Sequence, residues 1–186
     1  SLCMSIPLGL IGLYPTEATS ILGSVSTAFF GAAIPEEIAK FIMLWLLLRK
    51  NPYFDEKMDG IVYAVCVSLG FAALENIMYL LSNAESYLSV GIARAIFAVP
   101  GHFCFGILMG YYYSLVKFYP KTPKKNKALI LVAPILVHGV YDSLLFIINV
   151  TPAISVILMI VFLVFCHKMW KYGSNRIQEH LKRDHC

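Results

Sequence analysis

Eight ionisable side chains lie within the apolar segments of this chain, and several of them are grouped in short clusters. A charge at the centre of a lipid bilayer costs about 2.5–3.5 kcal/mol even on lenient insertion scales, so such residues indicate function by default. In chain order they are Glu36, Glu37, Lys40, Glu75 (followed by Asn76), Arg94, His102, His138 and Asp142. These residues require a chemistry that uses carboxylates and histidines together in an environment with little water.

The first cluster is two adjacent carboxylates, Glu36 and Glu37, followed by Lys40. On a helix the lysine lies three and four residues further on, so its ammonium can reach either carboxylate. Neighbouring carboxylates in a low dielectric resist ionising together, and the lysine favours the charged form of one of them. Such a pair suits a general base that takes a proton from water and later returns it. The alternative is a buried ion pair that only locks helices together.

The second cluster is His138 with Asp142, four residues apart on one helical face. The carboxylate can accept from the imidazole, fix its tautomer and leave the other nitrogen facing a cavity. That nitrogen could donate to a developing oxyanion, although a satisfied interhelical histidine is the alternative. Glu75 could hold a water with Glu36 or pair with Arg94. His102, which follows a Pro-Gly pair, is expected as a polar wall, a substrate contact or a packing residue.

Zinc is the main alternative for the mechanism, because two histidines with carboxylates can bind it. No HExxH motif is present, and no two histidines lie on one helical turn. The five cysteines have neither disulfide nor metal-ligand spacing, and no nucleophile-elbow serine motif occurs. We therefore expect no cofactor and assign no metal ligand, with zinc left open.

The elements that must position these residues are long apolar helices. Of the 186 residues, 59% are hydrophobic and only 14% charged, with a mean hydropathy of +0.71. This composition predicts an all-α fold, a polytopic transmembrane helical bundle of about six spans. We expect one transmembrane domain over residues 1–170 and a basic cytoplasmic tail over 171–186. The apolar runs cover residues 2–13, 20–48, 60–82, 89–116, 127–149 and 153–170.

The distribution of basic residues predicts the orientation of these helices. Of the 15 Lys and Arg, only Lys40 and Arg94 lie within spans, and the other 13 fall at 49–57, 117–127 and 168–183. The intervening loops carry no Lys or Arg, so loops with and without basic residues alternate as six spans require. The positive-inside rule places the basic loops and the tail in the cytoplasm of a cell-membrane protein. The charge needs no nucleic-acid partner.

Three prolines, Pro35, Pro100 and Pro134, precede the polar residues by one to four positions. Proline removes a backbone donor, and in a membrane the freed groups must be satisfied by protein or by a wet cavity. We predict that a helix restarts near Pro35, with Glu36 and Glu37 in a first turn whose positive end favours anions. At about 1.5 Å per residue, the polar residues reach compatible depths. The prediction is proline-broken helices around an intramembrane polar cavity.

Four motifs in order resemble the PrsW family of intramembrane proteases: PEEIAKF, DGIVYAVCVSLGFAALEN, PGHFCFGILMG and HGVYD. That family is related to the CAAX prenyl protease and bacteriocin-processing superfamily, whose pattern is EExxxR, FxxxH and HxxxN/D. The resemblance covers roughly residues 30–145. Lys40 stands one position closer than the superfamily's arginine, and Glu75 replaces the FxxxH histidine. Both departures agree with the PrsW branch and argue against prenyl-protein processing.

The resemblance implies a glutamic-type protease that makes the first cut in a stress-response cascade, on the outer side of the membrane. Its partner would be a single-pass membrane protein substrate, typically an anti-sigma factor, within the lipid bilayer. By position, the Glu36–Glu37 pair would activate water, and His138 with Asp142 would serve the oxyanion. The family is also classed by some as metal-dependent, which keeps zinc open.

We therefore expect an intramembrane endopeptidase with Glu36 as general base and His138 as oxyanion donor. Glu37 and Glu75 would help to position the water, with support from His102, Asp142, Lys40, Asn76 and Arg94. A proton- or ion-coupled transporter is the alternative, since intramembrane Glu, Asp and His chains also form proton relays. The internal repeat common in transporters is not evident. A third alternative is a scaffold that uses the polar residues as interhelical contacts.

Overall fold

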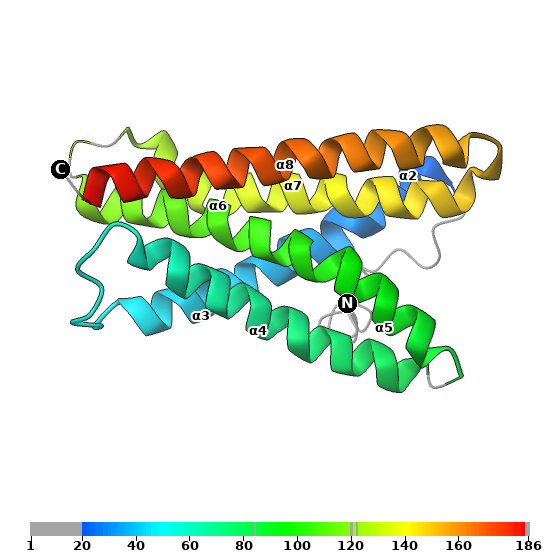
Figure 1. Ribbon diagram of the computed structural model, residues 1–186, viewed down its shortest axis with the longest axis horizontal. Coiled ribbons are helices and arrows are strands. Elements are labelled where there is room, and N and C mark those ends of the chain that lie inside the picture. The colour runs from blue at the N-terminus through cyan, green and yellow to red at the C-terminus, as the bar shows by residue number, and fades with distance from the viewer. Residues whose placement is uncertain (1–19, 84, 120, 122, 185–186) are drawn as a thin grey trace.

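The computed structural model describes residues 20–184 except 84, 120 and 122, and these residues form a bundle of long helices (Figure 1). Within this part every regular element is helical. The predicted apolar run at 2–13 lies outside the described residues. The elements, in order, are α2 (Ile21–Ser26), the π-helix η1 (Thr27–Ala33), α3 (Ile34–Leu48), α4 (Asp59–Ser82), α5 (Tyr87–Ile96), α6 (Ala98–Phe118), α7 (Lys125–Val150), the 3₁₀-helix η2 (Pro152–Ile154) and α8 (Ser155–Asp184).

Among the residues that the structure describes, four helical stretches are long and apolar enough to cross a membrane: Asp59–Ser82, Tyr87–Phe118, Lys125–Val150 and Pro152–Lys182. A further helical run covers Ile21–Leu48, but a π-helix divides it into three segments. The predicted count of about six spans is therefore not confirmed. Residues 171–184, expected as a tail, continue α8 as helix. The all-helical class agrees with the prediction.

The prolines do not all break helices as predicted. The chain stays helical through Ile34, whose N–H donates to the carbonyl of Phe29, five residues back. Pro35 lies where the backbone hydrogen bonding changes from π-type to α-type. The N–H that proline lacks is therefore missing at this change of pattern, and the helix continues through it. Glu36 and Glu37 do occupy the first turn of α3. Near Pro100 the helix is interrupted at Phe97, between α5 and α6.

The prediction of a proline-broken helix is wrong at Pro134, because α7 runs through this residue without a break. Transmembrane helices tolerate proline where neighbouring helices and local adjustments satisfy the freed backbone groups. Pro134 is fully buried among such neighbours. The polar cavity therefore does not depend on a broken helix at this position.

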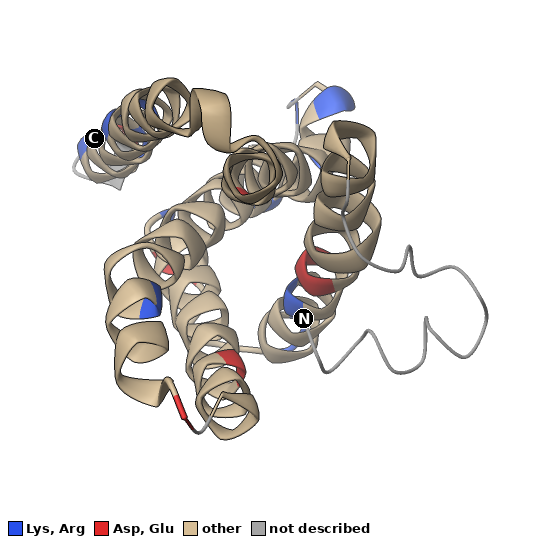
Figure 2. Cartoon of the chain, turned by 90° about the vertical axis from the view of Figure 1, so that its right-hand side faces the viewer, with Lys and Arg blue, Asp and Glu red and all other residues tan. Residues whose placement is uncertain are grey.

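The central helix of the bundle is α6, which is buried along most of its length from Gly101 to Leu115. By contrast, α8 lies at the edge of the bundle, as the end-on view in Figure 2 shows, and its apolar part is almost entirely exposed. An apolar helix that faces outward in this way suits contact with lipid. The core is thus built between α6 and the helices around it.

The connections that carry the basic residues lie at one end of the bundle. The α3–α4 and α6–α7 connections and the end of α8 are at the left of Figure 1, and the α4–α5 and α7–α8 connections are at the right. Loops with basic residues and loops without them, which alternate along the sequence, therefore lie at opposite ends of the bundle. This asymmetry is the basis for an orientation in the membrane.

Helices α4 and α6 touch through their backbones at glycine. A Cβ atom added to Gly110 would overlap the carbonyl oxygen of Gly60 and lie 2.6 Å from the Cα of Ile61. Gly106, one turn earlier, faces the Cα of Val65 in the same way. Small residues allow such close approach of helices in membranes, where packing drives association. The α4–α6 contact holds Glu75 and His102 at a fixed separation.

Gly110→Ala should destabilise the protein by about 1–3 kcal/mol, because the added methyl group has only backbone to displace. The matched control is Gly70→Ala on the same helix pair, where an added Cβ meets nothing within 4 Å. Thermal unfolding in detergent should show a lower Tm for the first variant and no decrease for the second. Equal Tm values for Gly110→Ala and the unchanged protein would contradict this account of the contact.

Candidate active site

A cavity of about 350 Å³ brings together most of the predicted polar residues. Five helices contribute its charged residues and histidines, namely α3, α4, α5, α6 and α7, and η1 and α8 add Ala32 and Met159 to the wall. An apolar part of the wall comes from Phe97, Leu145, Ile148 and Met159. The charged and titratable residues that line it are Glu36, Glu75, Arg94, His102, His138 and Asp142. The structure therefore brings these predicted polar residues together in one cavity, as their compatible depths indicated.

Glu37 lies behind the cavity wall and connects α3 to α7. Its Oε1 accepts a hydrogen bond from Lys40 Nζ at 2.6 Å and lies 2.8 Å from His138 Nδ1. The predicted contact of Lys40 with this carboxylate pair is thus formed, and Glu37 is the partner. All three side chains are buried. Because Glu37 is engaged on both sides, its role in this arrangement is to hold His138 and Lys40 in place.

Both ring nitrogens of His138 face carboxylates. Its Nε2 lies 3.2 Å from Asp142 Oδ2, as the four-residue spacing predicted. Its Nδ1 faces Glu37, and this corrects the expectation that the second nitrogen would point into a cavity. The close packing of η1, which leads directly into α3, against α7 explains the difference, since a Cβ at Gly139 would overlap the ring of Phe29. It is the Asp142 side of the ring that lines the cavity.

A second set of contacts ties α5 to α4. Arg94 Nη2 donates to Glu75 Oε2 at 2.7 Å, and its Nε donates to Asn76 Oδ1 at 2.6 Å. Its guanidinium also lies over the Tyr79 ring, 4.0 Å from the centroid. The predicted pairing of Glu75 with Arg94 is thereby formed. Since α5 has no buried residue, these contacts are its specific attachment to the site.

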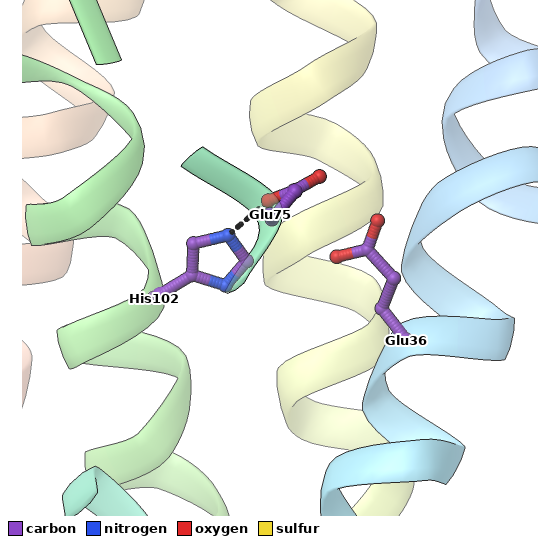
Figure 3. Close-up of side chains that lie close together, drawn as sticks. All are labelled: Glu36, Glu75 and His102. Atoms are coloured by element: carbon purple, nitrogen blue, oxygen red, sulfur yellow. Dashed lines mark hydrogen bonds and ion pairs between the residues drawn. The ribbon is translucent and has the colours of Figure 1, made fainter. Parts of the chain in front are cut away.

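His102 joins the two sets of contacts. Its Nδ1 lies 2.8 Å from Lys40 Nζ, and its Nε2 lies 3.1 Å from Glu75 Oε2. Figure 3 shows the ring pointing from α6 toward Glu75, with Glu36 reaching in from the opposite helix. From the sequence, His102 was expected as a polar wall, a substrate contact or a packing residue. The structure places it at the centre of the cluster.

Glu36 differs from the other carboxylates of the site. Its Oε2 is buried and has no hydrogen bond to any residue in the described part of the chain. The nearest charged partner of that oxygen is His138 Nε2, at 3.9 Å. Glu37, Glu75 and Asp142 each have a histidine or basic partner within 3.2 Å. Glu37 Oε2 is also buried without a hydrogen bond, but Oε1 of the same carboxylate contacts both Lys40 and His138. Among the described residues, Glu36 is therefore the carboxylate that lines the cavity without a close donor.

Sequence reasoning missed the aromatic residues that support the histidines. Phe105 stacks on His138 with ring centroids 4.5 Å apart, and Tyr141 donates from its hydroxyl to the Phe97 carbonyl at 2.8 Å. Tyr141 also lines the cavity. These residues stand in apolar runs, and their sequence spacing carried no signal for a site. Only the packing of α6 against α7 reveals them.

The chain matches the family described as "PrsW family intramembrane metalloprotease" over residues 4–167. Among curated proteins it is similar to Protease PrsW of Clostridioides difficile (strain 630), with 36% identity over 160 residues, 84% of this chain and 65% of that protein. Protease PrsW of Bacillus subtilis (strain 168) is also 36% identical over 160 residues, 84% of this chain and 68% of that protein. The chain thus spans about two thirds of the length of these relatives. No solved structure matches it.

The match covers most of the chain, so the protein belongs to the PrsW protease family. The predicted resemblance is confirmed. The match begins before the first motif and extends beyond the last, so it covers more of the chain than the residues 30–145 on which the resemblance rested.

The family description raises the question of a metal. One oxygen each of Glu36 and Glu75 and one nitrogen of His102 lie within 4.8 Å of one another, close enough to share an ion. However, a metal-ligating histidine almost always donates its other N–H to an acceptor. Here Nδ1 of His102 faces the Lys40 amino group, and a lysine ammonium offers only donors. The cluster fits a metal by distance but not by its hydrogen bonds, and we derive no step through one.

Proposed function

We propose that this protein is an intramembrane endopeptidase that hydrolyses a peptide bond with water activated by Glu36. The observation that carries the proposal is that Glu36 lines the cavity with a buried oxygen that has no hydrogen bond to any described residue. Glu37 also has one unbonded oxygen, but its other oxygen contacts Lys40 and His138, and Glu37 does not line the cavity. A general base must have a free lone pair within reach of the water that it deprotonates. Membership of a family described as proteases supports the same reaction.

In the proposed reaction, Glu36 takes a proton from a water in the cavity as the water oxygen bonds to the scissile carbonyl carbon. The carbonyl π electrons move to the oxygen, where His138 Nε2 donates in place of its bond to Asp142. The carbon–nitrogen bond then breaks, and Glu36 returns the proton to the leaving nitrogen. His102, held by Glu75 and Lys40, forms the opposite polar wall and keeps the water near Glu36.

The proposed substrate is a single-pass membrane protein such as an anti-sigma factor, cut on the outer side of the membrane. Two features support this. The cavity is lined by Arg94 and Asn149, which lie near the end of the bundle opposite the basic loops, the end that the positive-inside rule places outside. Its apolar wall suits the apolar residues of a membrane segment. The orientation with basic loops and the end of α8 in the cytoplasm is part of the same proposal.

Cleavage should persist after exhaustive removal of divalent metal ions. The purified protein would be reconstituted in liposomes with a membrane-anchored peptide substrate, with products identified by mass spectrometry with and without a chelator. Loss of cleavage on chelation, its return with zinc and about one zinc per chain by elemental analysis would overturn the glutamate mechanism. Proton flux in the same liposomes without cleavage would instead indicate the transporter.

A further inference from the structure

We propose that Lys40 keeps divalent metal ions out of the Glu36–Glu75–His102 cluster, so that the cavity holds water there. The inference deepens the proposed function and rests on the same site. It assigns to Lys40 a positioning role, exerted through the imidazole of His102.

The first step is the direction of the hydrogen bonds around His102. Lys40 Nζ lies 2.8 Å from Nδ1, and an ammonium can only donate, so Nδ1 is the acceptor. A neutral imidazole carries one proton, which then lies on Nε2. Nε2 donates it to Glu75 Oε2 at 3.1 Å. The nitrogen that faces Glu75 is thereby used as a donor, and its lone pair is not offered to an ion.

The second step is that Lys40 is held in this position. Its Nζ also donates to Glu37 Oε1 at 2.6 Å, and its side chain is 1% exposed. Aromatic rings of Phe71 and Phe105 flank the ammonium, with centroids 4.9 and 5.7 Å away. Moving the ammonium from His102 would also disturb its contact with the buried Glu37 carboxylate. Lys40 is therefore a fixed donor, unlike a flexible surface lysine.

A comparison within the same site supports the assignment. His138 has a carboxylate, Glu37, on its Nδ1, which is the arrangement that metal-ligating histidines normally use. His102 has a cation in the equivalent place. The positive charge of Lys40 opposes a divalent ion at the cluster as well. Hydrogen bonding and charge therefore act in the same direction at His102.

The test measures metal affinity in variants of the whole protein. Lys40→Gln replaces the ammonium with an amide whose oxygen can accept from Nδ1, and Lys40→Met removes the donor. Purified in detergent and stripped of metal, both should bind Zn²⁺ and Co²⁺ about 10–100-fold more tightly than the unchanged protein, the usual scale for changing a residue that hydrogen-bonds a metal-ligating histidine. The matched control, Lys127→Met, removes an exposed lysine at the start of α7 and should change nothing.

Two results would overturn the proposal. One is equal or weaker metal binding by both Lys40 variants. The other is an unchanged protein that binds one zinc tightly and loses it on His102→Leu. Adding His102→Leu to Lys40→Gln should abolish the gain, which shows whether the ion uses this histidine. Because the readout is binding, a failure here is distinguishable from a failure to cleave peptides.

A measurement on the unchanged protein covers the case in which the Lys40 variants do not fold. Nitrogen-15 spectra of histidine-labelled protein, with His102 assigned by its loss in His102→Leu, report which ring nitrogen carries the proton. We expect the Nε2–H tautomer, unaltered by equimolar zinc. An Nδ1–H tautomer, or a shift of the His102 signals on adding zinc, would contradict the proposal.

Discussion

Glu36→Gln should lower kcat by about 10²–10⁴-fold, the usual contribution of a general base, and leave Tm almost unchanged. The amide keeps the shape of the side chain but cannot accept a proton from water. Stability should persist because the lost Oε2 has no hydrogen bond to any described residue. The measurement is single-turnover cleavage of a membrane-anchored peptide in liposomes, with thermal unfolding of the same preparation.

The neighbouring carboxylate provides the matched control. Glu37→Gln replaces a group that is paired with both Lys40 and His138, so it should lower Tm together with activity. The two variants change the same functional group one residue apart, and only the first should separate activity from stability. Cleavage by Glu36→Gln at the rate of the unchanged protein would contradict the assignment of Glu36 as the general base.

The contacts that could be predicted from the sequence are those within one helix. The spacing of three residues between Glu37 and Lys40, and of four between His138 and Asp142, places each pair on one helical face whatever the tertiary structure. The cost of burying charge then predicted that these pairs would converge. Glu75 with Arg94 could be proposed for the same reason, because both need a partner inside a membrane.

The contacts that could not be predicted depend on how separate helices pack. Lys40 and His102 are 62 residues apart, and their contact requires α3 and α6 to meet at one level. The pairing of Glu37 with His138 likewise depends on Phe29 fitting against Gly139. Sequence spacing carries no information on such contacts. For this reason the sequence leaves the role of His102 open between a polar wall, a substrate contact and a packing residue.

The same distinction applies to the helices: their extent follows from local sequence, whereas the effect of each proline depends on tertiary packing. The apolar runs predicted α4 and α7 closely, because length and composition decide whether a helix suits a membrane. The effect of each proline was harder to predict, since neighbouring groups decide whether a lost hydrogen bond is replaced. At Pro35 the π-helix η1 absorbs the change, and at Pro134 the helix continues.

The second large effect is expected at His138, which serves both the reaction and the packing. His138→Ala should lower kcat by about 10²–10³-fold through loss of the oxyanion donor. It should also destabilise the protein by about 3–5 kcal/mol, because Glu37 and Asp142 lose the ring between them. The measurement is kcat per folded molecule, with Tm measured separately by thermal unfolding.

Asp142→Asn separates these two roles of His138. The amide oxygen can still accept from Nε2, so the ring should keep its place while the charge beside it is lost. The decrease in Tm should therefore be smaller than for His138→Ala. If His138 acts only as a packing residue, the activity of each variant will follow its Tm, and Asp142→Asn will be nearly fully active. If His138 donates to the oxyanion, His138→Ala will remain inactive at temperatures where it is still folded, because lost packing cannot account for that deficit.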